Sequence, residues 1–118
     1  MRCIIAGGRD FNDIERLYKV MNSCPYEVTE VVCGMAQGAD HLGHCWALEN
    51  NIPIKCFHAD WNGLGKKAGH IRNTKMGDYA NENGDGLLVA FWDKSSRGTK
   101  HMIDYATKIG MTVKVFNY

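Results

Sequence analysis

Two kinds of hydrophobic pattern alternate along this chain from one end to the other. Five short apolar segments have the length of strands and cover residues 3–6, 28–33, 52–57, 87–91 and 111–116. Between them, apolar residues recur at helical spacing over 14–21, 39–49, 71–80 and 99–109. This strict β-α alternation predicts a parallel sheet, because right-handed crossovers carry the helices onto its two faces. We therefore expect an α/β protein with three layers.

The apolar patterns of the five strands predict their order in the sheet. Residues 3–6 and 87–91 are continuously apolar, which is typical of interior parallel strands. Residues 52–57 and 111–116 alternate apolar with polar positions, and Pro53 cannot donate a hydrogen bond to a neighbouring strand, so both are predicted at the edges. These assignments favour the Rossmann-like order 3-2-1-4-5. The alternative, the flavodoxin-like order 2-1-3-4-5, would bury the third strand.

Local signals also predict where helices begin and end. Asn12 followed by Glu15 has the spacing of a capping box, so Asn12 is the predicted N-cap of the first helix. Gly110 follows the fourth helical segment, where a left-handed C-terminal residue is favoured.

Composition limits the classes of function. A chain of 118 residues that is 45% hydrophobic fits one domain, 1–118, with a core of its own. The 14 Lys and Arg against 13 Asp and Glu give a net charge of +1, which argues against a nucleic-acid partner. No apolar stretch approaches the roughly 20 residues that span a bilayer, the N-terminus does not predict a secretory signal, and the five cysteines show no C-x-x-C. We expect a cytoplasmic protein with reduced thiols and no membrane partner.

Glycine-rich and charged loops follow the first four strands, at the edge of the sheet where such folds bind ligands. Residues 63–76 hold four Lys or Arg and no acid, and residues 94–101 hold three more. Glycines expose backbone N–H groups and helix N-termini attract anions, so a phosphate-binding crevice is predicted there, most strongly at 95–99. The candidate ligand-binding residues are Gly7, Gly8, Arg9, Asp10, Gly34, Gly38, Ala39, Asp40, His70, Arg72, Asn73, Trp92, Ser95, Ser96, Arg97, Gly98 and Thr99.

Several alternatives remain open at this stage. Ser95 or Ser96 can equally serve as a helix N-cap. Trp61 and Trp92 can stack on a base or cover apolar surface. The chain contains neither G-x-x-x-x-G-K-[ST] nor G-x-G-x-x-G, and its His and Cys residues match no zinc-ligand spacing, so we expect no cofactor and no metal.

Four segments of the chain resemble the SLOG superfamily, specifically its small YspA/YpsA-like branch. They are residues 7–11 (GGRDF), 34–40 (GMAQGAD), 68–76 (AGHIRNTKM) and 97–102 (RGTKHM). The resemblance runs nearly end to end. It implies a Rossmann-like domain that binds a nucleotide or nucleotide-derived small molecule, as a homodimer or larger oligomer, in a family common in bacteria, plasmids and phages.

The resemblance leaves two functions to compare. The first is a binding protein that acts as a sensor, carrier or sponge. The second is a hydrolase like the LOG-type phosphoribohydrolases, acting on a nucleoside monophosphate or an ADP-ribose-like compound. LOG-type enzymes carry a catalytic Glu in a Gly-Gly-x-Gly-Thr-x-x-Glu loop; this chain has Met102 at that position, while Arg72 matches their arginine. Asp10, Asp40 and Asp93 all stay candidates for a replacement acid, and the catalytic residue is unassigned.

Overall fold

A five-stranded parallel sheet forms the centre of the molecule, in the order β3-β2-β1-β4-β5. The structure is a computed structural model that describes residues 1–118, apart from the side chain of Lys66. The strands are β1 (Arg2–Gly7), β2 (Glu30–Cys33), β3 (Ile54–Cys56), β4 (Leu87–Trp92) and β5 (Thr112–Asn117). The predicted α/β class and strand order are confirmed, and the two alternating strands are the two edges.

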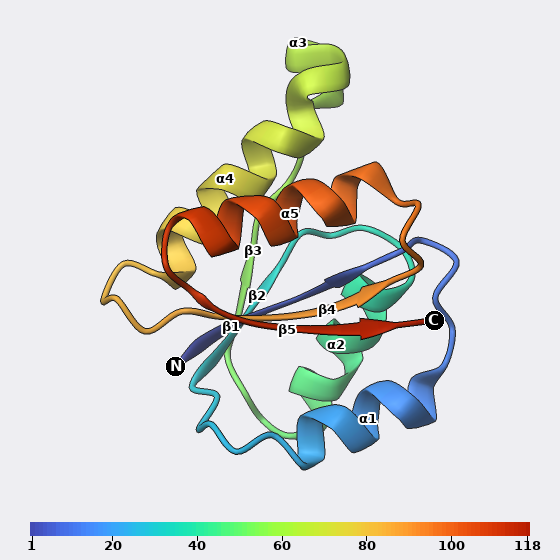
Figure 1. The fold of residues 1–118 in the computed structure, drawn as a ribbon, viewed down its shortest axis with the longest axis vertical. Coiled ribbons are helices and arrows are strands. Elements are labelled where there is room, and N and C mark those ends of the chain that lie inside the picture. The colour runs from blue at the N-terminus through green and yellow to red at the C-terminus, as the bar shows by residue number, and fades with distance from the viewer.

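Helices cover both faces of the sheet (Figure 1). One face carries α1 (Ile14–Asn22) and α2 (Ala39–Glu49), and the other carries α4 (Ala68–Ala80) and α5 (Arg97–Lys108). A short α3 (Trp61–Leu64) and the 3₁₀ helix η1 (Gly65–Lys67) extend beyond α4. Among the described residues, no helix is both long and apolar enough to cross a membrane.

Each interior strand contributes side chains to two separate cores. Ile5 of β1 and Phe91 of β4 pack with α1 and α2, whereas Ile4 of β1 and Leu88 of β4 pack with α4 and α5. These four side chains are at most 1% exposed. Because both faces of β1 and β4 are covered, the continuous apolar runs of the sequence are explained.

The helix ends differ from the predicted ones in three places. Asp13, rather than Asn12, caps α1, because its carboxylate accepts the N–H of Arg16 at 3.1 Å. The helix predicted from residue 71 begins at Ala68. The short α3 is an additional helix that the sequence does not predict, because its residues show no apolar pattern at helical spacing. The helix predicted from residue 99 begins two residues earlier. Gly110 has the expected positive φ, at 84°.

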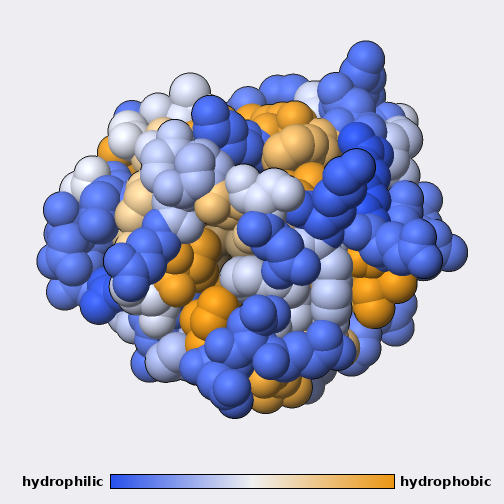
Figure 2. Space-filling view, turned by 90° about the horizontal axis from the view of Figure 1, so that it is seen from below, coloured by the Kyte–Doolittle hydropathy of each residue, from blue (hydrophilic) through white to orange (hydrophobic). Residues whose placement is uncertain are grey.

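An apolar groove of about 540 Å³ separates α1 from β5. Figure 2 shows this side of the molecule, with apolar side chains in a hollow among hydrophilic ones. Val20, Leu87, Val89 and Phe116 contribute to its apolar lining. The groove lies on the α1 and α2 face, away from the loops that the sequence singles out.

The close packing of α2 on β1 gives a test of the fold. A Cβ at Gly43 would lie 2.7 Å from Cγ2 of Ile5, whereas a Cβ at Gly98 in α5 would meet nothing within 4 Å. We expect Gly43→Ala to lower the free energy of unfolding by about 1–3 kcal/mol through overpacking, despite alanine's better helix propensity. Gly98→Ala is the matched control and should be neutral or stabilising by up to roughly 1 kcal/mol. Equal effects of the two variants in urea unfolding would contradict this packing.

Candidate functional site

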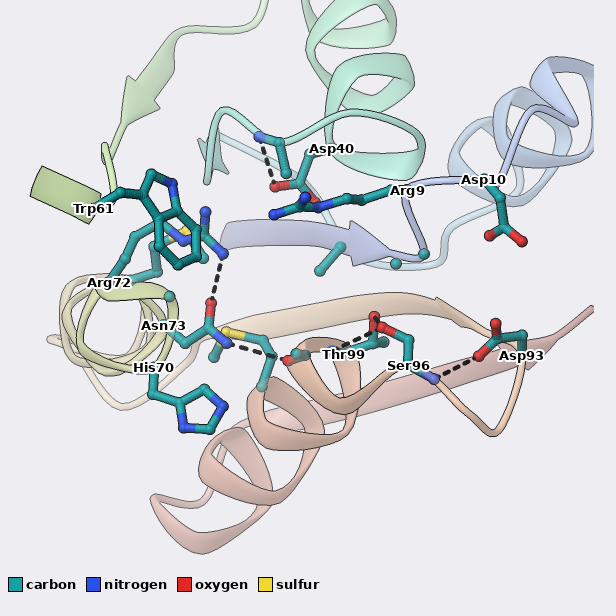
Figure 3. Close-up of a pocket in the computed structure, with 18 residues that line it drawn as sticks. Arg9, Asp10, Asp40, Trp61, His70, Arg72, Asn73, Asp93, Ser96 and Thr99 are labelled. Carbon is teal, nitrogen blue, oxygen red and sulfur yellow. Dashed lines mark hydrogen bonds between the residues drawn. The ribbon is translucent and has the colours of Figure 1, made fainter. Parts of the chain in front are cut away.

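A crevice of about 520 Å³ opens at the carboxyl ends of β1 and β4. These neighbouring strands lie where the strand order reverses, which is where open α/β sheets bind ligands. Figure 3 shows the side chains that face one another across it. The lining residues are Ala6, Gly7, Gly8, Arg9, Asp10, Ala36, Asp40, Trp61, Gly69, His70, Arg72, Asn73, Met76, Asp93, Ser96, Gly98, Thr99 and Met102.

Most of the residues predicted from the sequence meet in this crevice. Those that line it are Gly7, Gly8, Arg9, Asp10, Asp40, His70, Arg72, Asn73, Ser96, Gly98 and Thr99. The end of β1, the loops after β1 and β4, and the first turns of α2, α4 and α5 supply them, from positions up to 92 residues apart in the chain.

The other predicted residues lie behind or beside the crevice. Gly34 lines an adjoining pocket. Gly38 begins α2, and Ala39 is buried beneath the glycine loop. The Trp92 indole donates to the carbonyl of Ser96 at 3.1 Å, which favours its packing role. Ser95 and Arg97 are exposed and lie outside the lining.

A helical spacing in the sequence marks part of this lining. Gly69, Arg72, Asn73 and Met76 have the i, i+3, i+4, i+7 spacing of one helix face, and α4 presents that face to the crevice. The predicted helix began at residue 71, so this face was incomplete. Trp61 of α3 also lines the crevice, with a side chain that is 50% exposed and lies against Gly69.

Glycines allow the β1–α1 loop to pack directly against the start of α2. The carbonyl of Gly8 accepts the N–H groups of Phe11 at 3.2 Å and Ala39 at 3.4 Å. Gly38 has φ of 73°, and a Cβ there would overlap the Gly8 carbonyl. The floor of the crevice is therefore backbone, with the N-terminus of α2 beside it.

Two arginines reach this site from opposite sides (Figure 3). Arg72 donates to the carbonyl of Gly34 at 2.9 Å and to Oδ1 of Asn73 at 3.2 Å. Asn73 in turn donates to the carbonyl of Gly98 at 3.2 Å, which joins α4 to the first turn of α5. Arg9 extends toward Asp40 and Arg72. In the described part of the chain, neither guanidinium belongs to an ion pair.

Three carboxylates also line the crevice, so its charge is mixed: Asp10 and Asp40 are among the predicted residues, and Asp93 joins them. Asp10 accepts the hydroxyl of Tyr118 at 2.6 Å. Asp93 accepts the N–H groups of Ser96 and Ser95, and these bonds lower the pKa of Asp93. Burial raises the pKa of Asp40 to about 6, against the opposing charge of Arg72.

His70, which lines the crevice, is one of a stacked pair of imidazoles. The rings of His70 on α4 and His101 on α5 are parallel within 2°, with centroids 3.9 Å apart. Nδ1 of His101 lies 3.2 Å from the amide nitrogen of Asn73 and so accepts its hydrogen. Burial and the neighbouring His70 lower the pKa of His101. The lowered pKa keeps His101 neutral at neutral pH, and its Nδ1 holds the Asn73 amide that orients Arg72.

Two comparisons find relatives of this chain among known proteins. The sequence model of the YspA, cpYpsA-related SLOG family matches residues 1–63, which contain the first two glycine loops. The Gene 61 protein of Mycobacterium phage D29 is 32% identical over 121 residues, spanning 95% of this chain and 93% of the phage protein. No solved structure matches.

The buried Asp40 predicts a pH-dependent stability. Its pKa rises from 3.8 to about 6 on folding, so between these values the folded state holds a proton that the unfolded state releases, and stability falls as pH rises. Asp40→Asn keeps an oxygen for the N–H of Ala36 but removes the buried charge. At pH 7.5 we expect the free energy of unfolding of this variant to exceed that of the wild type by on the order of 3 kcal/mol. Below pH 4 we expect no such gain, because Asp40 is then protonated in the folded and the unfolded wild type. Urea unfolding at both pH values measures it; a pH-independent difference would contradict the assignment.

Proposed function

This chain belongs to the YspA, cpYpsA-related SLOG family, and on that premise we propose that its crevice binds the phosphate of a nucleotide or nucleotide-derived small molecule. One observation carries the proposal. The first turn of α5 and the guanidinium groups of Arg9 and Arg72 face the same crevice, and neither arginine has a carboxylate within ion-pair distance among the described residues.

The donors around α5 suit a phosphoryl group. Ser96, Gly98 and Thr99 surround the start of the helix, where unpaired N–H groups and the positive end of the helix dipole attract anions. The hydroxyls of Ser96 and Thr99 are hydrogen-bonded to each other at 2.9 Å, so one hydroxyl hydrogen is used between them and the other is left as a further donor. Arginine adds charge and planar, paired N–H groups, which match phosphate oxygens.

The rest of the lining suits the other parts of a nucleotide. Asp10 and Asp93 are exposed or half-buried acceptors, as ribose hydroxyls require. The half-exposed indole of Trp61 at the rim offers a face on which a base can stack. A site for a simple inorganic anion would gain nothing from these carboxylates, so the mixed charge favours a nucleotide.

We propose binding without turnover, as a sensor, carrier or sponge. Met102 is 1% exposed and lines the crevice at the position where LOG-type enzymes carry their catalytic Glu, and a thioether does not stabilise a ribosyl cation. The alternative is hydrolysis of an N-glycosidic bond, and Asp40 favours it because its pKa of about 6 suits an acid–base group. Asp40 is, however, only 6% exposed, which limits its access to a ligand.

Chromatography after incubation with AMP or ADP-ribose distinguishes binding without turnover from hydrolysis. Release of free base or ribose phosphate would show that the protein is a hydrolase and would contradict binding without turnover.

The proposal includes self-association, which the family resemblance implies. A homodimer or larger oligomer is expected in solution. Light scattering coupled to size-exclusion chromatography measures this directly, and a mass of 13.2 kDa at all concentrations would contradict it.

The arginines provide the direct test of phosphate binding. We expect AMP and ADP, but not free adenine, to raise the melting temperature. Arg9→Ala should weaken their binding by roughly tenfold or more, because a charge-assisted contact to phosphate is lost. Arg97→Ala is the matched control, since Arg97 is a cation at the start of α5 outside the lining, and its loss should change affinity less than about threefold. A panel in which no phosphate compound shifts the melting temperature would rule the proposal out.

A further inference from the structure

A second pocket adjoins the crevice on the side of β2 and β3. Its volume is about 320 Å³, and we call it the β2–β3 pocket. Its own lining consists of Gly34, Met35, Gln37, His58 and Ala59, from the loops that follow β2 and β3. It shares Arg9, Ala36, Trp61 and Arg72 with the crevice. The two cavities therefore adjoin at these four residues, which we call the junction.

Two arginine side chains, Arg9 and Arg72, lie at this junction. Arg72 is held there by the carbonyl of Gly34 and by Asn73, and Arg9 reaches toward it from the end of β1. Two guanidinium groups that share one junction repel each other, and an anion between them removes that repulsion. The nearby carboxyl of Asp40 is buried and turned to the N–H of Ala36, and it is not in an ion pair with either arginine in the described structure.

The junction also lies close to the first turn of α5. Asn73 links Arg72 to the carbonyl of Gly98, so the guanidinium of Arg72 and the start of α5 are two hydrogen bonds apart. Two neighbouring phosphoryl groups can therefore be bound at once, one at the arginines and one at α5. A diphosphate carries two neighbouring phosphoryl groups and can occupy both positions, whereas a monophosphate can occupy only one of them.

Space for an organic group exists on both sides of the junction. Both volumes fall within the roughly 300 to 1000 Å³ typical of small-molecule sites. On the crevice side, Asp10 and Asp93 offer acceptors for hydroxyls. On the other side, the exposed Gln37 and His58 offer an amide and an imidazole, and among the described residues no carboxylate lines that pocket. The two cavities thus differ in chemistry, as sites for two different groups do.

The loop after β2, which lines the β2–β3 pocket, has an unusual backbone conformation. Met35 has φ of 60°, a left-handed conformation that costs a non-glycine residue about 1 kcal/mol or more. Its side chain is 47% exposed, so burial of this side chain does not explain the conformation. The turn directs the neighbouring Gly34 carbonyl to Arg72 and shapes the β2–β3 pocket.

We propose, on the basis of the function proposed above, that the ligand belongs to the two-ended nucleotides, in which a diphosphate joins two organic groups. The diphosphate lies between Arg9, Arg72 and the start of α5. One organic group occupies the crevice, and the other passes Trp61 into the β2–β3 pocket. A mononucleotide fills only one of these cavities.

Calorimetric titration of the full chain tests this with defined compounds. The two-ended compounds are ADP-ribose, NAD and UDP-glucose, and each is compared with its mononucleotide, AMP or UMP. We expect at least one two-ended compound to bind about tenfold or more tighter than its mononucleotide, because a second set of contacts joins the first.

Two histidine variants then assign the ends to the cavities. His58→Ala removes a group that lines only the β2–β3 pocket, and His70→Ala removes one that lines only the crevice. Each should weaken the preferred two-ended compound by about fivefold, whereas a mononucleotide should respond to only one of them. His41→Ala is the matched control, because His41 is exposed on α2 outside both linings, and should change no affinity.

The outcomes separate this inference from the function on which it rests. If mononucleotides bind and no two-ended compound binds tighter, the inference is overturned and phosphate binding stands. An unchanged affinity of every two-ended compound for His58→Ala also overturns it. If none of the five compounds binds, both the inference and the proposed function fail.

Discussion

The carbonyl of Gly8 is the contact on which the rest of the site depends. It accepts hydrogen bonds from Phe11 in its own loop and from Ala39 at the start of α2, while the N–H of Gly8 donates to Phe91 of β4. The backbone of one residue therefore joins the end of β1 to β4 and α2. Side chains are excluded from this contact, since a Cβ on Gly8 would overlap the Tyr118 hydroxyl. The glycine pair thus brings the loop ends close enough for Arg9, Asp40 and α5 to face a common space.

A second network fixes the opposite wall. Asn73 is 3% exposed and uses both ends of its amide: Oδ1 accepts from Arg72, while the nitrogen contacts Gly98 and His101. An amide with four possible hydrogen bonds is well suited to this position, because it orients a cation on one helix against the backbone of the next. This wall consequently depends on the packing of α4 against α5, whereas Gly8 and Arg9 come from the loop after β1.

The fold could be predicted from the sequence because strands buried on both faces, β1 and β4, require continuous apolar residues. The edge strands β3 and β5 instead alternate apolar with polar residues. The glycine loops could be placed at the ligand edge for the same reason. Side-chain direction was harder to predict. Moving the start of α5 from residue 99 to Arg97 makes Ser96 the cap and turns Arg97 outward. The short α3 is defined by the Asp60 cap on Gly63, at 2.9 Å, and such a local contact leaves no hydrophobic period to detect. The number of basic residues in the loops at the ligand edge of the sheet does not reveal which of their side chains face the crevice.

The position of Trp61 gives the molecule an optical property of its own. Its indole stands half in water at the border of the two cavities, whereas Trp46 is 5% exposed and hydrogen-bonded to Asn22, and Trp92 is held by Ser96. Trp61 is therefore the most exposed of the three indoles, and Trp92 is only partly buried. Iodide in solution reaches the Trp61 ring most readily, so the native chain carries a fluorescent probe at the border of the two cavities and needs no attached dye.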